Sequence, residues 1–206
     1  MSPWITMSVV MAVIGAVWSQ ARVRNILLRK LLSAQKAGDK TAFTKLLATP
    51  AARLYFSKLT QIIMTTNFAL SFEDIITLRK SIRLLVTQPQ RNREFVICLM
   101  KAYTFYLERG LTDDALKIEN SLQPLTTRFP EMKNEMQTLH QLFIEHDPLL
   151  VIELKHKLRE EKTPEAQLVL LYRLSKLEEL LGQTEASATH LGRLRRLART
   201  NIKALN

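Results

Sequence analysis

The sequence has few residues that interrupt helices and almost no capacity for disulfides. Its 206 residues include five glycines, seven prolines and one cysteine, Cys98. A single cysteine excludes an internal disulfide, so nothing indicates an oxidising compartment. Cys98 lies in the apolar run "REFVICLMKAY", where a thiol is usually a small buried hydrophobe; a reactive thiol is the alternative.

The sequence also lacks the alternating Val and Ile pattern of strands after residue 20. Leu dominates an apolar fraction of 47%, and Lys, Arg, Glu and Gln supply much of the remainder. This composition is typical of helices and predicts an all-α fold.

Catalytic motifs are missing as well. There is no glycine-rich phosphate loop and no Gly-x-Ser-x-Gly elbow, and adjacent acidic pairs such as Glu178 and Glu179 point in different directions on a helix. The four histidines have no zinc-ligand spacing. The segment "IEHDP" at 144–148 could be a metal or acid–base cluster, but a helix end with Asp147 capping the next helix is simpler. We therefore expect no enzyme activity, no cofactor and no metal.

The net charge of +11 is unevenly distributed. Residues 1–72 carry +8, residues 73–185 carry −2 and residues 186–206 carry +5. A nucleic-acid-binding protein more often carries its charge on one face of the folded body, so this distribution argues against that class.

Residues 1–21 contain no charged side chain. A helix of about 20 residues spans the hydrocarbon layer, and Trp4 and Trp18 bracket the most apolar stretch as interfacial aromatics do. Basic residues follow directly, and such a flank favours the cytoplasmic side and contact with anionic lipid. These residues are Arg22, Arg24, Arg29 and Lys30.

We therefore predict a single-pass membrane protein, with residues 1–21 as a transmembrane anchor, the N-terminus outside and residues 22–206 in the cytoplasm. Two alternatives remain. One is a cleaved signal, which would lack the usual basic n-region, and the other is a helix buried in the protein or a partner.

Helix start and stop signals are frequent after residue 18. Gly38 is expected to end one helix, with Asp39 capping the next. Ser71 with Asp74 resembles a capping box, and Gly110 and Gly182 mark further ends. Cap-plus-proline starts stand at Thr49-Pro50, Asp147-Pro148 and Thr163-Pro164.

The main breaks fall near residues 38, 71, 110, 147 and 182, which are 33, 39, 37 and 35 residues apart. A nearly regular spacing of about 20–50 residues is the signature of stacked helix pairs. The sequence therefore predicts an α-solenoid of about five antiparallel helix pairs over residues 22–206, preceded by the transmembrane helix.

The last unit, "LLYRLSKLEELLGQTEASATHLGRLRRL", resembles the tetratricopeptide-repeat family. The first-helix positions of the family pattern fall on Leu171, Leu174 and Ser175, and the turn glycine is Gly182. The second-helix positions fall on Ser187, Leu191 and Leu194. Glu178 departs from the pattern, because the family usually has an aromatic residue there. The first unit shares the turn, since "AGDKTAF" at 37–43 parallels "LGQTEAS" at 181–187.

The resemblance implies a protein-interaction scaffold or adaptor that binds a protein or peptide along the first helix of each pair. We expect these helices at about 51–66, 91–109, 131–145 and 165–181. The candidate partner-binding residues on them are Arg93, Lys101, Tyr103, Arg173 and Lys176. Tyr103 has a second interpretation, packing between helices. The alternative functions are a basic nucleic-acid-associated helical protein and a structural subunit of a larger membrane complex.

Overall fold

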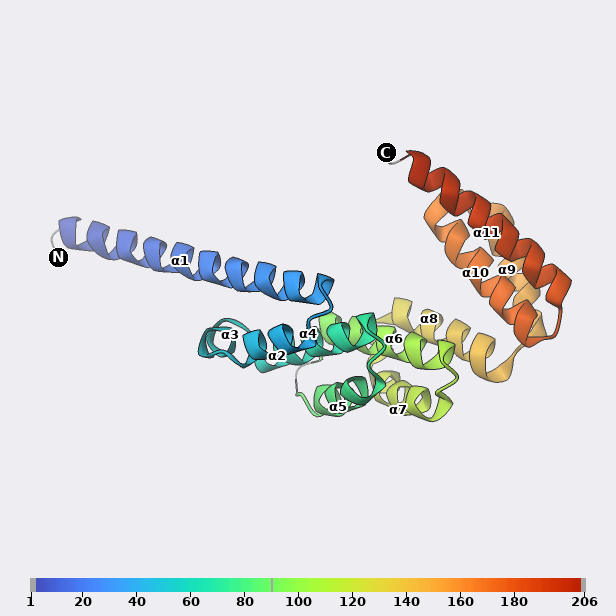
Figure 1. Ribbon diagram of the computed structural model, residues 1–206, viewed down its shortest axis with the longest axis horizontal. Coiled ribbons are helices and arrows are strands. Elements are labelled where there is room, and N and C mark those ends of the chain that lie inside the picture. Colours follow the sequence, from blue (N-terminus) through green and yellow to red (C-terminus); the bar gives the residue numbers. More distant parts are fainter. Residues whose placement is uncertain (1–2, 90, 205–206) are drawn as a thin grey trace. The chain divides into compact units, whose positions relative to one another are not determined.

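The computed structural model describes the backbone of residues 3–89 and 91–204, and the side chains of residues 18, 20–89 and 91–201 (Figure 1). Every regular element in these ranges is a helix. The all-α prediction is confirmed. The chain divides into two compact units, residues 1–98 and residues 99–206.

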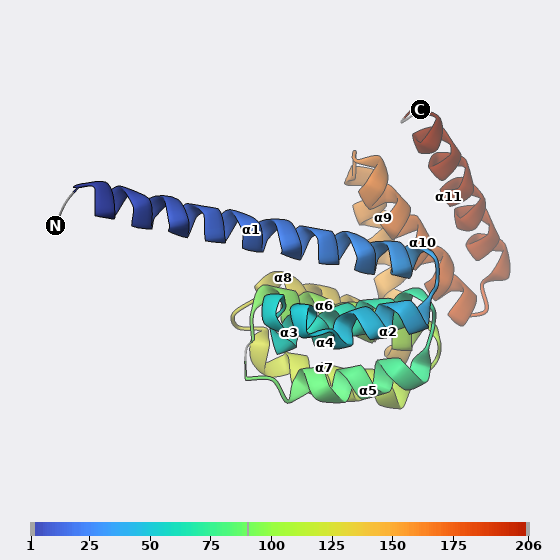
Figure 2. The ribbon, with the colours of Figure 1, turned by 60° about the vertical axis from the view of Figure 1, so that its left-hand side comes forward.

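The first unit contains five helices and the start of a sixth. They are α1 (Pro3–Lys36), α2 (Lys40–Ala48), α3 (Pro50–Tyr55), α4 (Lys58–Ser71), α5 (Ile75–Val86) and α6 (Arg93–Glu108), which continues into the second unit. The last part of α1 packs on α2 and α3, and α4 packs on α5, whereas the first half of α1 extends past α2 and α3 (Figures 1 and 2). The core of this unit includes the stacked rings of Phe43 and Phe68, whose centroids are 4.3 Å apart.

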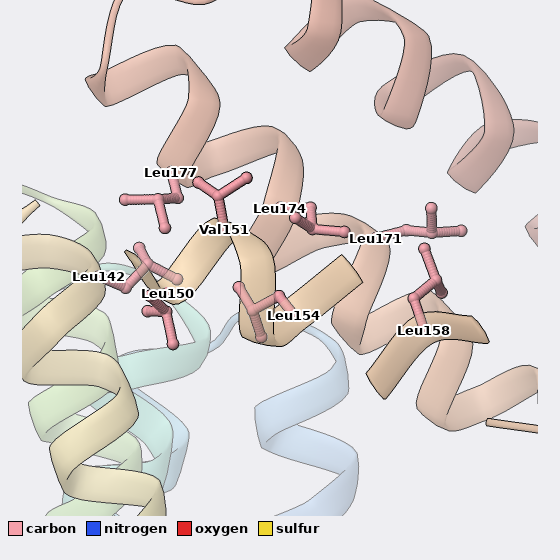
Figure 3. Packing of buried hydrophobic residues seen from close by; sticks show 8 residues of the cluster. All are labelled: Leu142, Leu150, Val151, Leu154, Leu158, Leu171, Leu174 and Leu177. Atoms are coloured by element: carbon pink, nitrogen blue, oxygen red, sulfur yellow. The ribbon is translucent and has the colours of Figure 1, made fainter. Parts of the chain in front are cut away.

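The second unit continues with α7 (Thr112–Leu122), a 3₁₀ turn (Gln123–Leu125), α8 (Pro130–His140) and a π-helical turn (Gln141–Glu145). It ends with α9 (Pro148–Glu160), α10 (Pro164–Leu180) and α11 (Thr184–Ala204). Helix α10 packs on both α9 and α11. Figure 3 shows the core of this unit, in which leucines of α9 and α10 point toward one another together with Leu142 and Val151.

Five turns recur at a nearly constant interval. Each has one residue in the left-handed region, and these residues are 35, 37, 36 and 36 positions apart: Gly38, Glu73, Gly110, His146 and Gly182. At four of them the next amide donates to the carbonyl five residues earlier, as from Gln183 to Glu178 at 2.8 Å. This is the Schellman pattern of a helix end. The predicted period of about 36 residues is therefore present in the backbone.

Burial repeats with the same interval. The residues seven and four positions before each left-handed residue are all buried. These pairs are Leu31 and Ala34, Thr66 and Ala69, Tyr103 and Tyr106, Leu139 and Leu142, and Ser175 and Glu178. They face the neighbouring helix of each pair, because residues three and four apart lie on one side of a helix.

The helix caps agree with the prediction at most sites and differ from it at two. Thr163 precedes α10 as expected, but its side chain makes no capping hydrogen bond. Asp39 accepts the amide of Ala42, and Thr49 accepts that of Ala52. Ser71, however, is the last residue of α4 and not a cap. Asp74 caps α5, because its carboxylate accepts the amide of Thr77 at 3.0 Å. The left-handed Glu73 lets the chain turn between these helices without a glycine.

Asp74 also makes the folded state sensitive to acid. Its ion pair with Lys40 and its hydrogen bonds from Thr77 lower the pKa of Asp74 from 3.8 to about 2. A lowered pKa means that the carboxylate stabilises the fold fully above pH 3.8 and loses this effect as pH falls through about 2. We expect Asp74→Asn to reduce the loss of stability between pH 4 and pH 2. Urea titrations across this range measure it.

The control for this prediction is Glu94→Gln, which changes an exposed carboxylate in the first turn of α6. It should leave the acid dependence unchanged. At pH 7, Asp74→Ala should lower the free energy of unfolding by about 1 kcal/mol, the usual effect of losing a helix cap. Identical acid profiles for Asp74→Asn and the natural chain would contradict this role.

The structure overturns the predicted membrane topology. Among the residues that it describes, no helix is both long enough and apolar enough to cross a bilayer. Helix α1 runs without a break across the expected boundary between residues 21 and 22, through the basic flank to Lys36, and its last turns are buried at Leu31 and Ala34. The prediction of a single-pass protein with the N-terminus outside and the repeats in the cytoplasm is therefore wrong.

Candidate peptide-binding groove

A groove of about 470 Å³ lies in the second unit between α8, the end of α9 and α10. Its apolar wall comes from one side of α10, with Ala166, Val169 and Leu170. Val169 lies in the middle of α10 and is 47% exposed. The groove therefore offers an apolar surface that no side chain of this unit fully covers.

The sequence positions this wall through helix periodicity. Helix α10 begins at Pro164, as the expected Thr163-Pro164 start predicts. Leu171, Leu174 and Leu177 lie on the buried side and enter the core shown in Figure 3. Val169 and Arg173 are four residues apart and so share another side of the helix, next to the groove.

Charged groups of both signs surround the apolar wall. Arg173 forms an ion pair with Glu135 of α8, which joins two sides of the groove. Lys157 is paired with Glu153, with 2.5 Å between Nζ and Oε1. Hydrogen bonds from the hydroxyl and the amide of Thr163 lower the pKa of Glu161. The groove can thus bind an apolar side chain in its centre and polar groups at its rim.

Tyr172 precedes the groove-lining Arg173 on α10. The hydroxyl of Tyr172 donates a hydrogen bond to Glu108 Oε1 at 2.8 Å. Burial and the neighbouring Glu108 carboxylate raise the pKa of Tyr172 above its ordinary value of 10.0. This tyrosine therefore stays protonated at physiological pH and acts as a hydrogen-bond donor.

The five predicted partner-binding residues differ in position and in exposure to solvent. Arg173 lines the groove, and Lys176 lies one turn further along α10, with its Nζ 3.0 Å from Glu179 Oε2. Arg93 and Lys101 are exposed on α6. Tyr103 is fully buried, so its side chain follows the packing interpretation and offers no surface to a partner.

The predicted membrane-interface residues belong to α1. Trp18 is exposed, and the guanidinium of Arg22 lies 5.7 Å from the centre of its ring. Arg24, Arg29 and Lys30 are exposed as well. The side chain of Trp4 lies outside the described residues.

A polar cluster joins α6, α7 and α8 in the second unit. Glu119 Oε2 accepts the hydroxyl of Tyr103 at 2.9 Å and lies 2.9 Å from His140 Nδ1. Burial and the Glu119 carboxylate raise the pKa of Tyr103. His140 Nε2 is 3.7 Å from Glu145, and these residues line a polar pocket of about 500 Å³.

A second polar cluster joins α9, α10 and α11, and Glu178 is its centre. Its side chain is 0% exposed. Lys155 Nζ lies 2.9 Å from Oε1, and His190 Nδ1 lies 2.7 Å from Oε2. Ser187 supports the same junction, because its hydroxyl donates to the carbonyl of Ser175 at 2.7 Å. A buried carboxylate with two basic partners thus ties three successive helices together.

Sequence reasoning missed both clusters. The only signal was Glu178 itself, which stands where the repeat pattern expects an aromatic residue. Its position is the fourth before a left-handed residue, and the equivalent positions hold Ala34, Ala69, Tyr106 and Leu142. A charge at a buried repeat position needs partners, but no spacing rule identifies Lys155 or His190.

The segment "IEHDP" at 144–148 is a helix end followed by a cap, the simpler of the two interpretations given above. The carboxylate of Asp147 accepts the amide of Leu149 at 2.9 Å and so caps α9. Within the described ranges, no group of three His, Cys, Asp or Glu side chains is placed to hold a metal ion.

Comparison with protein-family models, with curated proteins and with solved structures gives no match to this chain.

Proposed function

We propose that this protein is a helical-repeat interaction module of the α-solenoid class, resembling tetratricopeptide repeats, and that it binds a peptide segment of a partner protein. The observation that carries the proposal is the partly exposed apolar wall of α10 with charged groups around it. Such a surface suits binding, because interfaces combine an apolar centre with a polar rim.

The regular turns and the repeated buried positions support the repeat class. Each helix pair buries one side of its helices, and one side of α8 and of α10 remains for a ligand. These helices correspond to the expected first helices at 131–145 and 165–181, which line the binding surface in the resembling family. The prediction that the chain is not an enzyme and needs no cofactor stays a prediction.

The groove also suggests what a bound peptide looks like. An apolar side chain of the peptide would contact Val169 and Leu170, while the ion pair of Arg173 and Glu135 offers a donor and an acceptor at the rim. A pocket of about 470 Å³ has room for a large side chain and its neighbours. Peptides with a bulky apolar anchor and mixed charge are therefore the expected ligands.

Val169→Asp is the variant that tests this function. A display library of random 12-residue peptides would be selected on the purified full chain, and enriched peptides would be synthesised for titration. We expect a shared apolar anchor, and a carboxylate at position 169 should weaken binding by tenfold or more, since a central apolar contact contributes about 2 kcal/mol. Fluorescence anisotropy measures the affinities.

The matched control is Leu149→Asp, which puts the same charge at an exposed apolar residue of α9 that does not line the groove. It should bind the selected peptides as tightly as the natural chain does. Equal loss in both variants, or no loss in Val169→Asp, would show that the groove is not the binding site.

A further inference from the structure

Helix α11 has two different sides. Leu194 and Leu197 pack against the core of α9 and α10. At 3.6 residues per turn, Arg195, Arg196 and Arg199 lie on the opposite side of the helix, and all three are exposed. The core-facing leucines hold the helix in place, so these arginines are presented on a fixed backbone.

The positive charge of this side is not neutralised within the unit. Among the described residues, Arg195, Arg196 and Arg199 form no ion pair. The sequence has no acidic residue after Glu185. Several carboxylates of the neighbouring helices are engaged with other cations: Glu153 with Lys157, Glu178 with Lys155 and His190, and Glu179 with Lys176. The exposed Glu165 of α10 has no ion pair among the described residues and pairs with none of the three arginines. The outer side of α11 therefore keeps its charge for an external anion.

The chemistry of this side favours a phosphate polymer over a protein. No large apolar residue is exposed on α11 within the described side chains. Stable protein interfaces need such anchors at their centre, whereas binding to a nucleic-acid backbone needs mainly cations. All the basic residues from Arg193 to Arg199 are arginines, whose planar guanidinium donates two parallel hydrogen bonds to one phosphate.

We propose that the outer side of α11 binds the phosphodiester backbone of a nucleic acid through Arg195, Arg196 and Arg199. The binding is independent of base sequence, because arginines on one exposed helix face with no aromatic neighbour contact phosphates and stack on no base. This surface is separate from the groove residues, so the inference does not rest on the proposed peptide binding.

The test is a titration of fluorescent 20-base-pair duplexes, one of DNA and one of RNA, with the full chain at several NaCl concentrations. We expect both duplexes to bind, and the logarithm of the affinity for DNA should fall with the logarithm of salt with a slope of about −3, given about 0.9 per neutralised phosphate. Combined substitution of Arg195, Arg196 and Arg199 by Gln should remove most of this slope and weaken binding at least tenfold.

The matched control removes the same charge elsewhere, by combining Arg22→Gln, Arg29→Gln and Lys30→Gln on the exposed part of α1. It should keep the slope and most of the affinity. Equal loss in the two triple variants would overturn the proposal, because it would indicate attraction to the net charge alone. A poly-glutamate peptide that binds more tightly than either duplex through the same arginines would also overturn it, in favour of an acidic protein. Circular dichroism verifies that both variants remain helical.

Discussion

Glu178→Ala is expected to lower the free energy of unfolding of the second unit by about 2 kcal/mol, the effect of losing a buried hydrogen bond to a charged group. The carboxylate is fully buried, and its removal takes the hydrogen-bond partner from His190 and the counter-ion from Lys155. Hydrogen exchange of the α10 and α11 amides, together with urea unfolding, measures this loss. The exchange of α11 should increase as well, because His190 of α11 loses its contact with α10.

A variant that lacks the whole cluster separates the cost of leaving the partners of Glu178 unpaired from the net contribution of the cluster to stability. Combining Lys155→Met, Glu178→Leu and His190→Leu replaces the cluster by apolar residues, as at the equivalent Leu142 and Leu154 of the preceding repeat. Such replacements are often neutral or stabilising. We expect this triple variant to be more stable than Glu178→Ala. A change below 0.5 kcal/mol for Glu178→Ala, the ordinary size for a surface residue, would contradict the structural role of the carboxylate.

Leu174→Ala is expected to lower the free energy of unfolding by about 2–5 kcal/mol, the range for a buried leucine reduced to alanine. Leu174 is 0% exposed and lies among leucines from α9 and α10 (Figure 3). The loss combines the transfer of the removed methyl groups with the cavity that remains, because close-packed neighbours relax only in part. Urea unfolding followed by circular dichroism gives the value.

Leu149→Ala is the control, because Leu149 is 70% exposed on α9 and so leaves no cavity. It should change stability by less than about 0.5 kcal/mol. Similar losses for the two leucines would mean that α9 and α10 do not form the common core seen in Figure 3.

The repeat interval could be predicted because local signals carry it. Gly38, Gly110 and Gly182 adopt left-handed conformations that a Cβ disfavours, and cap residues follow the turns. At Gly38 an added Cβ would also come within 3.2 Å of the Phe72 ring. The turns at Glu73 and His146 have no glycine, so their placement was less accurate, and the break expected at Ser71 lies two residues later.

The candidate binding groove could be predicted only in part. Arg173 was identified because it lies on an expected first helix, but Val169 gave no signal, since an apolar residue in a helix is normally buried. The polar clusters were missed because their residues come from three helices each. The membrane prediction rested on the lack of charge in residues 1–21, but within the described ranges no helix, α1 included, is both long enough and apolar enough to cross a bilayer.

The π-helical turn at Gln141–Glu145 has a consequence for what defines these repeats. There the amide of Asp147 donates to Gln141, six residues earlier, where the other turns span five. The hydrogen-bonded turn is one residue wider here, yet Leu142 keeps its buried place four residues before the left-handed residue, and the intervals to the neighbouring left-handed residues stay at 36. The end of a first helix can therefore change its hydrogen-bond pattern while its buried residues keep their register. The repeat is thus defined by the spacing of its buried side chains and tolerates more than one backbone geometry at its turns.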